Sequence, residues 1–494
     1  MTSDAEVIES RNGYPLLNKR LNLMELGTEN INTLKLLPAL PNVIVSTKYY
    51  KDATDKGAGT YKIVDNTGLT ADDYSLIDLA NGLQAQLIIT DAINVRLFGA
   101  LGDSTADDTQ AFKRAIAYAE NLKDDTGLNR FIKGISIYVP DGTYKLTEPL
   151  VIKKSGINII GESSSGTILY SPDATFDGIV FDGSTLALYN STINNIKLYR
   201  PGNSTAGCGI RFINVINSIN SNVEIAGAFE GVEVNSCGKI YINKFLVTQT
   251  NRSSGTAVGY QIKVLGDLST PGDIHFSDVQ VTPSYLNQDY TMLIRASDGL
   301  YFDNFHIHGG VLIEPRGTMA GTCEDTLASI FFNNSYFDNA KKYNIWLKGN
   351  ATNYRNIFFN NSYIRGAVTG LYISTETKLQ MLQVRGGKVG GQLQHGIFVE
   401  NSNFADSTFA HIAFENNNRS GLSDGTDVLI RGNGIIADGT THYNDNPRPG
   451  YLYNLGSASS NCLVTNIMGT NSKVTSNNYK VTNSGTNNTV GTVI

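Results

Sequence analysis

The sequence predicts an all-β fold, a right-handed, single-stranded parallel β-helix in which the chain winds as a solenoid. Three observations predict it. Glycine accounts for 49 of the 494 residues and charged residues for only 17%, which suits many short strands joined by polar turns. A motif of the form Gly-apolar-x-apolar-x recurs every 19 to 34 residues, a period typical of solenoids. The phrase IFFNNSY occurs twice, beginning at Ile330 and at Ile357.

A short capping helix is expected before the first coil. Asp107 and Asp108 stand where a helix cap belongs, and the apolar residues Ala111, Phe112 and Ile116 follow at helical spacing. A helix in this place would cover the open end of the solenoid, where unpaired strand edges promote aggregation.

Two sets of apolar residues are predicted to fill the interior. The fourth residue of the Gly motif is apolar in nine copies: Phe181, Phe212, Val234, Ile262, Ile294, Ile313, Leu347, Ile373 and Val399. The central residue of a second strand in each coil is apolar as well: Leu198, Ile225, Val247, Val281, Ile307, Phe337, Ile364 and Val389. Parallel coils place equivalent side chains ~4.8 Å apart, so each set is expected to form a column. A β-sandwich with coincidental alternation would not keep one register through nine copies.

The Asn pair in the repeated phrase is predicted to lie in a turn. Asn tolerates left-handed backbone, and stacked Asn side chains bond to one another. Asn304, Asn334 and Asn361 are therefore expected to form one column of such a ladder.

The segment before the coils resembles the pectate-lyase-like parallel β-helix superfamily. The matching pieces are Phe98, Gly99, Ala100; Gly102, Asp103; Asp107, Asp108, Thr109; and Pro140, Gly142, Tyr144. The coil repeats extend the resemblance to about Asn433. Residues 42–65 are similar to the small head module of phage tailspikes, which attaches the spike to the virion.

The resemblance implies a bacteriophage tailspike, a homotrimer that binds and depolymerises a bacterial capsular or O-antigen polysaccharide. It implies a head module at 1–90 that joins a phage tail or adaptor protein, and a β-helix at 91–433 that carries the polysaccharide site. Residues 434–494 would form a C-terminal cap and trimer contact, or alternatively a disordered tail. The protein would be part of the virion and act at the host cell surface. Its polar start, MTSDAEVIES, is not a secretion signal, as expected for release by lysis.

Outward positions on the Gly-motif strand are expected to bind sugar. Trp346, Tyr372 and Phe398 would form an aromatic ladder, and aromatic faces suit the C–H face of sugar rings. A trimer interface is the alternative for these three residues. Glu314 and Lys348 place charge beside them and are further substrate-binding candidates.

Glu376 and Glu400 are the first candidates for an acid–base pair. Glu376 is expected one strand step beyond Ser374 on the same face. It would then lie one coil and two residues from Glu400, ~8 Å between backbones. Inverting glycosidases hold their two carboxyl groups about 6.5–9.5 Å apart, with one protonated and the other ionised.

The outward positions after the repeated phrase form a second candidate site. One column would stack Thr248, Thr282, His308, Asp338 and Arg365. Asp338 and His308 are catalytic candidates, because a carboxylate orients an imidazole, and Asp338 with Arg365 would alternatively hold a charged sugar. His306 and Tyr336 are substrate-binding candidates beside them. A surface salt-bridge ladder would explain the same residues without function.

Other features exclude whole classes of function. The net charge of −6 and the lack of a Lys/Arg cluster argue against nucleic acid, and no apolar run approaches the ~18 residues of a membrane span. Cys208, Cys237, Cys323 and Cys462 lack metal-ligand spacing and are expected as buried thiols. No metal and no cofactor are expected. The Asn-Thr-Asp and Gly-His-Gly triplets of polygalacturonases do not occur, so pectin is not the expected substrate.

Three interpretations of function remain open at this point. The first is glycosidic hydrolysis, with Glu376 and Glu400 or Asp338 and His308 as acid and base. The second is β-elimination of a uronate-containing chain, for which His306, His308, Tyr336, Arg365 and Lys388 supply the required residue types. The third is a receptor-binding fibre without catalysis.

Overall fold

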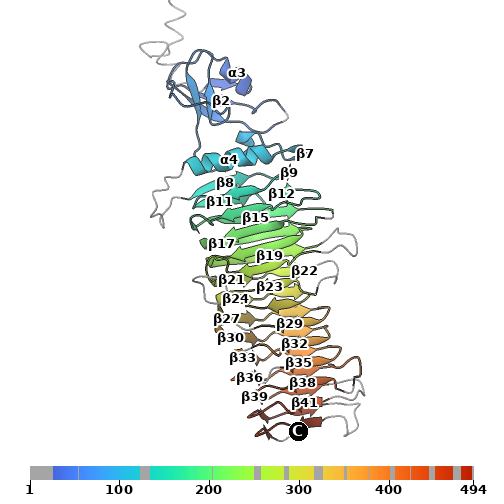
Figure 1. Ribbon diagram of the computed structural model, residues 1–494. Coiled ribbons are helices and arrows are strands. Elements are labelled where there is room, and N and C mark those ends of the chain that lie inside the picture. The colour runs from blue at the N-terminus through green and yellow to red at the C-terminus, as the bar shows by residue number, and fades with distance from the viewer. Residues whose placement is uncertain are drawn as a thin grey trace, which may run out of the picture. The chain divides into compact units, whose positions relative to one another are not determined.

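Parallel strands make up most of the protein in the computed structural model (Figure 1). The structure describes residues 26–53, 55–122, 134–202, 204–249, 258–282, 289–315, 326–349, 353–377, 379–400, 406–422, 424–443, 451–470 and 480–491. The chain divides into two compact units, residues 1–170 with 194–196, and residues 171–193 with 197–494.

The first unit begins with a five-stranded sheet in the order β1-β2-β3-β5-β4. Its strands are β1 (Leu26–Thr28), β2 (Ile44–Thr47), β3 (Thr60–Val64), β4 (Leu76–Asp78) and β5 (Gln84–Leu87), and a helix, α3 (Ile31–Lys35), lies between the first two in sequence. Alternation explains the strands: in β3, Tyr61 and Ile63 are fully buried while Lys62 is exposed. The extent of the head module at 1–90 stays a prediction.

The capping helix is confirmed as α4 (Thr109–Asn121), which packs on β8 and β10 of the same unit. The expected side-chain cap is wrong in detail. The carboxylate of Asp108 instead accepts the backbone N–H groups of Leu101 and Gly102 at 2.6 and 3.1 Å, and burial raises its pKa to about 6. Asp107 accepts the N–H of Thr109 at 3.0 Å. The neighbouring elements are β6 (Ile93–Asn94), η1 (Val95–Phe98), β7 (Asp103–Asp107), β8 (Ile135–Val139), β9 (Gly142–Lys145), β10 (Leu150–Ile152), β11 (Ile157–Gly161) and β12 (Thr167–Tyr170).

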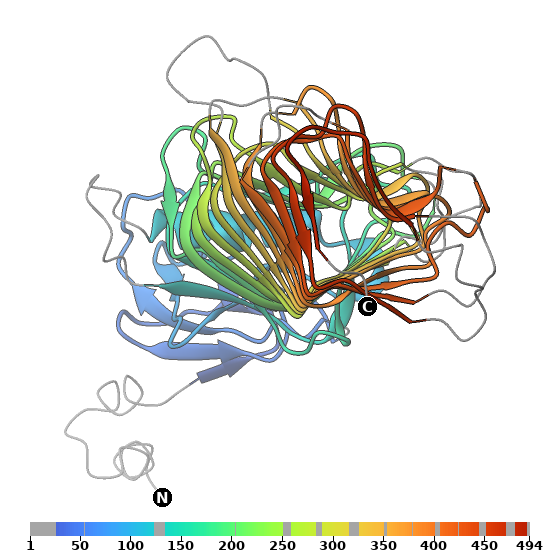
Figure 2. The same ribbon diagram turned by 90° about the horizontal axis from the view of Figure 1, so that it is seen from below.

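The second unit is a parallel β-helix whose coils have three faces, here called A, B and C. Successive strands of each face lie over one another when the unit is viewed down the axis of the solenoid (Figure 2). Face A comprises β21 (Gly272–Ser277), β24 (Ser297–Asp303), β27 (Thr326–Asn333), β30 (Asn353–Asn360), β33 (Gln380–Arg385), β36 (Ser407–Ala410), β39 (Ile435–Asp438), β42 (Leu463–Thr465) and β45 (Thr489–Val490). Face B comprises β22 (Gln280–Thr282), β25 (His306–His308), β28 (Tyr336–Asp338), β31 (Tyr363–Arg365), β34 (Lys388–Gly390), β37 (Ala413–Glu415), β40 (Thr441–Tyr443) and β43 (Met468–Thr470).

Face C carries the strands of the Gly motif. They are β13 (Ile179–Asp182), β16 (Cys208–Ile213), β18 (Glu230–Asn235), β20 (Ile262–Leu265), β23 (Met292–Ile294), β26 (Val311–Ile313), β29 (Tyr343–Leu347), β32 (Thr369–Ile373), β35 (His395–Val399), β38 (Thr426–Ile430), β41 (Tyr451–Leu455) and β44 (Lys480–Asn483). Early in the unit, β14 (Leu188–Tyr189) and β15 (Thr192–Tyr199) precede β17 (Val215–Ala226) and β19 (Gly238–Thr248), and the last two continue from face A onto face B.

The turn predicted at the Asn pair is the corner between faces A and B. Asn304, Asn334 and Asn361 are left-handed there, with φ of 51°, 49° and 48°. The hydrogen-bonded ladder runs one residue earlier than expected. The amide of Asn360 donates to Asn333 and that of Asn333 to Asp303, each at 2.9 Å.

The predicted interior columns are confirmed, with one exception. Phe337 and Ile364 are direct partners on adjacent strands, and the second-strand column holds its register from Ile225 to Val389. In the Gly-motif column, however, Val234 pairs with Val264 rather than with Ile262. Both Ile262 and Val264 point inward, so a shift by two residues preserves the apolar pattern that the prediction relied on.

The coils continue past residue 433. Strands β39 to β45 pair in parallel with the coils before them, so the described part of 434–494 belongs to the same solenoid. Its role as a cap and trimer contact stays a prediction. Cys208, Cys237 and Cys462 are buried free thiols as predicted, whereas Cys323 lies outside the described residues. Within the described ranges, no helix is long and apolar enough to cross a membrane.

The glycine of the Gly motif is required by the spacing of the coils. A Cβ at Gly209, Gly231 or Gly370 would lie 2.8, 2.3 or 2.5 Å from a backbone carbonyl oxygen of the next coil. Such an oxygen cannot move away without separating two hydrogen-bonded strands, so a side chain at this position strains the stack.

Replacing Gly370 by Ala is therefore expected to destabilise the protein by about 1–3 kcal/mol, a typical cost of overpacking. The apparent unfolding temperature by circular dichroism, or the unfolding rate in guanidinium, measures the effect. Gly238→Ala is the matched control, because the nearest atom to its Cβ is 3.9 Å away, and about 0.5 kcal/mol or less is expected there. Equal losses in the two variants would contradict the steric explanation of the motif.

Candidate functional site

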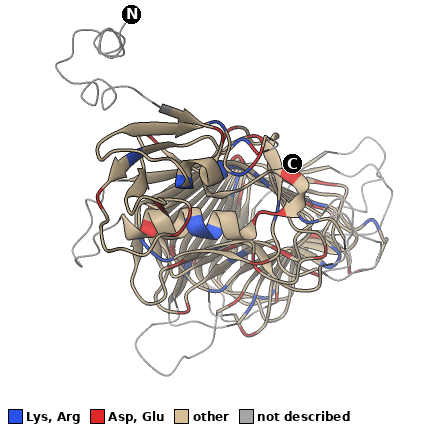
Figure 3. Cartoon of the chain, turned by 90° about the horizontal axis from the view of Figure 1, so that it is seen from above, with Lys and Arg blue, Asp and Glu red and all other residues tan. Residues whose placement is uncertain are grey.

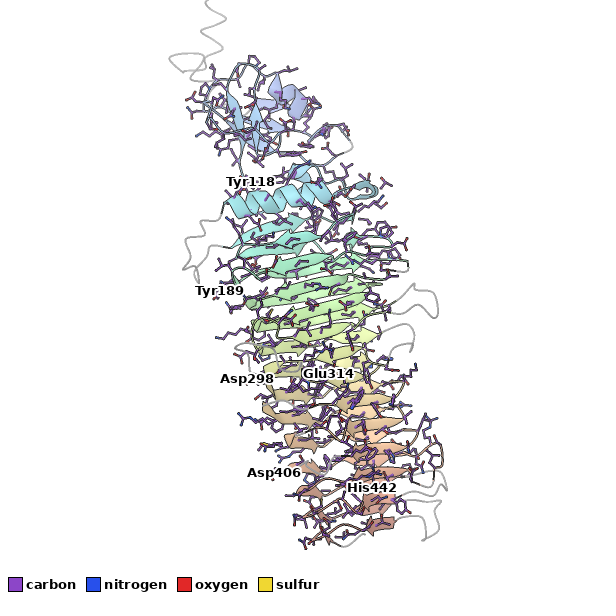
Figure 4. All side chains as sticks on the ribbon, viewed as in Figure 1. Tyr118, Tyr189, Asp298, Glu314, Asp406 and His442 are labelled. Carbon is purple, nitrogen blue, oxygen red and sulfur yellow. The ribbon has the colours of Figure 1, made fainter. Side chains whose placement is uncertain are left out.

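The predicted site residues fall on two different faces of the solenoid rather than on one. His306, His308, Tyr336, Asp338 and Arg365 lie on face B. Trp346, Lys348, Tyr372, Glu314 and Glu400 lie on or directly after strands of face C, where Glu314 is labelled in Figure 4. The two groups are therefore described separately.

Face B stacks the predicted residues in two neighbouring columns. One column reads His306, Tyr336, Tyr363 and Lys388, and the other reads His308, Asp338, Arg365, Gly390 and Glu415. Because the residues between the columns, such as Ile307 and Phe337, are buried, both columns point outward. The pattern predicted this column of His308, Asp338 and Arg365, and the register confirms it.

The two imidazoles are close neighbours. The ring centroids of His306 and His308 are 4.8 Å apart, and the ring of Tyr336 meets His306 edge-on at 4.7 Å. Burial lowers the pKa of His306, and the nearby His308 lowers it further, while Asp338 opposes the shift. His306 is therefore a neutral imidazole at neutral pH, which is the state that accepts a proton.

Arg365 is held by the residues around it. Its guanidinium hydrogen-bonds Tyr336, and this bond and the nearby Tyr363 raise its pKa. Its backbone carbonyl accepts the side-chain amide of Asn344, a buried residue at the corner between faces B and C, at 2.8 Å. One carboxylate oxygen of Asp338 is buried and meets no hydrogen-bond partner among the described residues. Asp338 is the register partner of Arg365 on the adjacent coil.

A pocket of ≈ 350 Å³ opens beside Arg365. It is lined by Tyr363, Arg365, Lys388, Gly391, Glu415, Asn416 and Arg419. In register, Gly390 stands between Arg365 and Glu415 in their column. Lys388 is paired with Glu415, and three cations against one carboxylate give the pocket a positive charge. Burial raises the pKa of the Tyr363 phenol, which stays protonated at neutral pH.

Face C carries an aromatic group in which Tyr343 and Tyr372 stack at 4.4 Å and 25° and the other ring pairs are tilted. Trp346 lies 5.5 Å from Tyr290 and from Tyr343 and 6.1 Å from Tyr372, with ring planes inclined by 38°, 62° and 37°. Tyr372 lies 5.4 Å from Phe398 at 52°. Each of these five side chains is half-buried. The outward ladder of Trp346, Tyr372 and Phe398 is thus confirmed in register.

The charges beside these rings are paired. Glu314 lies between Arg295 and Lys348, at 2.9 and 3.2 Å, and Glu400 lies 3.7 Å from Arg431. Seen end-on, both acidic and basic residues are scattered over the chain (Figure 3). On earlier coils of the same face, Arg211 and Glu233 are register partners and form an ion pair at 3.3 Å.

The placement predicted for Glu376 is wrong. Strand β32 ends at Ile373, Ser374 is buried rather than outward, and Glu376 lies exposed in the following turn. Although burial opposes it, hydrogen bonds from its own backbone and from the hydroxyls of Ser374 and Thr375 lower the pKa of Glu376. The hydroxyl of Tyr372 donates to Glu400, and burial and this bond raise the pKa of Tyr372. Glu376 is therefore held ionised, which does not suit the acid of an acid–base pair.

Several residues of these sites were not predicted from the sequence. Glu415 was detectable, because AFE at 413–415 repeats the pattern of YIR at 363–365. Arg419 lies in an irregular segment after strand β37, and Tyr290 lies in an irregular segment before strand β23. No periodicity therefore marks either residue. Glu324 and Asp325, in the insertion RGTMAGTCEDT at 316–326 of the sequence, lie outside the described residues. Throughout the described part of the chain, no three His, Cys, Asp or Glu side chains are grouped as a metal site.

Comparison with known proteins relates part of the chain to sugar-acting families. Residues 92–293 match the family model described as rhamnogalacturonase A/epimerase, pectate lyase-like. A K2-specific capsule depolymerase of Klebsiella phage vB_KpnP_KpV74 is 27% identical over 138 residues. That match covers 28% of this chain and only 21% of the relative, so the chain spans about a fifth of its length.

Two solved structures show likeness at low identity. A family 28 exopolygalacturonase of Yersinia enterocolitica is 12% identical with a TM-score of 0.49, and the match covers 89% of this chain and 84% of that one. The tailspike gp49 of Acinetobacter baumannii phage Fri1, a capsular polysaccharide depolymerase, is 12% identical with a TM-score of 0.44, covering 93% and 75%.

The environment of His306 predicts how its pKa responds to its neighbours. We expect a value below the ordinary ~6.5 in the wild type. His308→Gln removes a competing cation and should raise the pKa of His306, whereas Asp338→Asn removes an anion and should lower it further. Titration of the histidine ring C–H signals by NMR measures this, and the chain has only six histidines to assign. Shifts in the opposite directions would contradict the arrangement of face B.

Proposed function

We propose that this chain, whose residues 92–293 are a pectate-lyase-like domain, depolymerises an acidic bacterial surface polysaccharide by β-elimination on face B. The observation that carries the proposal is the positive pocket at Arg365. The neutral imidazole of His306 lies two coils before Arg365 on the same face, ~10 Å between backbones, and the Arg365 guanidinium reaches back to Tyr336 in the coil between them. The capsule depolymerase relative supports a surface polysaccharide as the substrate. The family match ends before residue 306, and the support for the reaction comes from the geometry of face B itself.

The pocket suits the carboxylate of a uronate. Arg365, Lys388 and Arg419 converge on it, and Arg binds carboxylates through two parallel hydrogen bonds. Pairing the carboxylate with these cations stabilises the negative charge that develops when the proton on the adjacent carbon, C5, is removed. A cationic pocket thus both selects an acidic sugar and makes its C5 proton easier to remove.

His306 and Tyr336 supply the two proton transfers. The neutral imidazole of His306 takes the proton from C5, the C5 electron pair forms the C4=C5 double bond, and the C4–O bond breaks. Tyr336 lies one coil from His306, with its ring 4.7 Å away, and it gives its phenolic proton to the departing oxygen. The products are an unsaturated uronate on one fragment and a free hydroxyl on the other.

Hydrolysis by paired carboxylates has less support on this face. Asp338 and Glu415 are the acids of its second column, and they are three coils apart, ~14 Å between backbones. Glycosidases need about 5–9.5 Å between their two carboxyl groups. Glu376 is held ionised and Glu400 is already bound by Tyr372 and Arg431, so that pair stays a weaker prediction.

The setting we propose is a phage tail. The chain would act at the host cell surface as a homotrimer, attached to the tail or an adaptor protein through residues 1–90. The likeness of residues 42–65 to tailspike head modules and the capsule depolymerase relative support this setting.

A panel of purified capsular polysaccharides from Klebsiella and Acinetobacter baumannii strains tests the reaction. β-Elimination gives new ultraviolet absorbance from the conjugated unsaturated uronate, whereas hydrolysis gives new reducing ends without it. Arg365→Ala should lower kcat/KM about 10²–10³-fold, the usual effect of losing one group that stabilises developing charge. His306→Gln should lower it about 10²–10⁴-fold.

Arg385→Ala is the matched control, because Arg385 is an exposed arginine on face A in the same coil as Lys388. Its activity should equal that of the wild type. Reducing ends without absorbance would overturn elimination in favour of hydrolysis. Binding without any shortening of the polymers would show a receptor-binding fibre, and no binding or cleavage across the panel would reject the function.

The pKa of His306 also predicts the pH dependence. Because this pKa is lowered, the base stays neutral to a pH below ~6.5 and loses activity only as it is protonated at lower pH. The acidic limb of kcat/KM should therefore lie below that value. It should move to higher pH in His308→Gln and to lower pH in Asp338→Asn. A limb above pH ~6.5 that neither variant moves would exclude His306 as the base.

A further inference from the structure

The aromatic group on face C is not used by the reaction proposed for face B. It consists of Tyr290, Tyr343, Trp346, Tyr372 and Phe398, here called the face C cluster. Trp346 is the only tryptophan of the chain. Its indole N–H is buried and meets no hydrogen-bond acceptor among the described residues, which is costly for a donor.

Face A carries a second set of outward aromatic rings, which are arranged differently from those of the face C cluster. There His275, Tyr301, Phe331 and Phe358 stack in register, with ring centroids 4.5, 5.1 and 4.8 Å apart and planes within 11° of parallel. Each ring covers the faces of its neighbours, so this ladder presents ring edges outward. In the face C cluster, Tyr343 and Tyr372 stack at 4.4 Å and 25°, but the planes around Trp346 are tilted by 37° or more, so the cluster is not a regular ladder of parallel rings.

The groups around the face C cluster suit an uncharged, hydroxyl-rich ligand. Glu314 is shared by Arg295 and Lys348, and Glu400 is bound by Tyr372 and Arg431. Lys348 Nζ lies 5.0 Å from the Trp346 ring centroid, and the Arg431 guanidinium lies 5.2 Å from that of Phe398. These paired groups still have N–H and oxygen atoms for hydrogen bonds to hydroxyls. Three cations and two carboxylates leave a net charge of +1, and Lys342 beside Tyr343 is offset by Glu376 near Tyr372, whereas the groups lining the face B pocket sum to +2.

We propose that the face C cluster is a second polysaccharide-binding site, which takes neutral pyranose rings and holds the polymer while face B acts on its acidic sugar. Pyranose rings pair an apolar C–H face with equatorial hydroxyls, and tilted aromatic rings bordered by paired charges match both features. This inference rests on the proposed function for its substrate, because it assigns the neutral part of the same polymer.

The two sites are close enough in the chain to share one polymer. Tyr343 begins face C only five residues after Asp338 ends face B, and the buried Asn344 next to it binds the carbonyl of Arg365. A polymer that crosses this corner would place acidic and neutral sugars on different faces. The repeat unit of the substrate should accordingly contain both kinds of sugar.

The intrinsic fluorescence of Trp346 reports on this site alone, since these 494 residues contain no other tryptophan. Titration with each capsular polysaccharide of the panel should give a saturable change. Tyr372→Ala and Phe398→Ala should weaken that binding about 2- to 12-fold each, the usual value of one aromatic contact. Tyr372→Phe keeps the ring and should bind almost as the wild type, which separates ring contact from a folding defect.

Tyr241→Ala is the matched control, because Tyr241 is an exposed ring at the end of the face A ladder. It should leave the titration unchanged. Carboxyl-reduced polysaccharide should still change Trp346 fluorescence although face B no longer cleaves it. That arm separates the two sites.

Three outcomes would overturn the inference. Cleavage without any response of Trp346 would reject the face C site and leave the reaction standing. Loss of the response on carboxyl reduction would assign the cluster to acidic sugars instead. A change in oligomeric state for Tyr372→Ala, measured by sedimentation, with unchanged polysaccharide binding would make the cluster a subunit contact. A response without cleavage would instead reject the reaction and keep the site.

Discussion

The parallel register of the coils is the constraint on which the rest of the structure depends. Each residue of a coil has an equivalent directly above and below it, ~4.8 Å away. Inside, like apolar residues satisfy this arrangement, as in the stack of Phe276, Phe302 and Phe332, whose ring centroids are 5.0 and 4.5 Å apart. The same spacing leaves no room for a Cβ at the motif glycines, because the next coil's carbonyl oxygen is already there. Packing therefore determines both the large apolar residues of the interior and the glycines of the motif.

The interior could be predicted from the sequence because every coil repeats the same packing problem. Phe337 above Ile364, and the left-handed Asn334 and Asn361, follow from that repetition alone. The one error of register, at Ile262, arose where two inward residues alternate in the same strand. A shift by two residues exchanges equivalent apolar side chains, so hydrophobicity cannot distinguish the two alignments.

The candidate site could be predicted only in part, since outward residues have no packing pattern to follow. The column of His308, Asp338 and Arg365 was recoverable because the phrase before it repeats. Glu376 was misplaced because strand β32 ends at Ile373, and alternation says nothing about where a strand stops. Trp346 and Arg365 belong to different faces because the chain turns a corner between faces B and C. The repeats of the two strands, read separately, do not reveal that corner.

Charge on an outward face is subject to the same spacing as the interior. Like charges on adjacent coils repel and opposite charges attract, each by roughly 0.2–1 kcal/mol. Face C follows this rule, with Glu314 between Arg295 and Lys348. Face B departs from it around the open pocket, where Arg365, Lys388 and Arg419 meet Glu415 as the one lining carboxylate and Asp338 adjoins Arg365 from the coil before. The charges on face C are paired, whereas three cations lie together on face B, which costs some stability. The carboxylate of an acidic sugar in that pocket would pair with these cations, as acidic side chains do on face C.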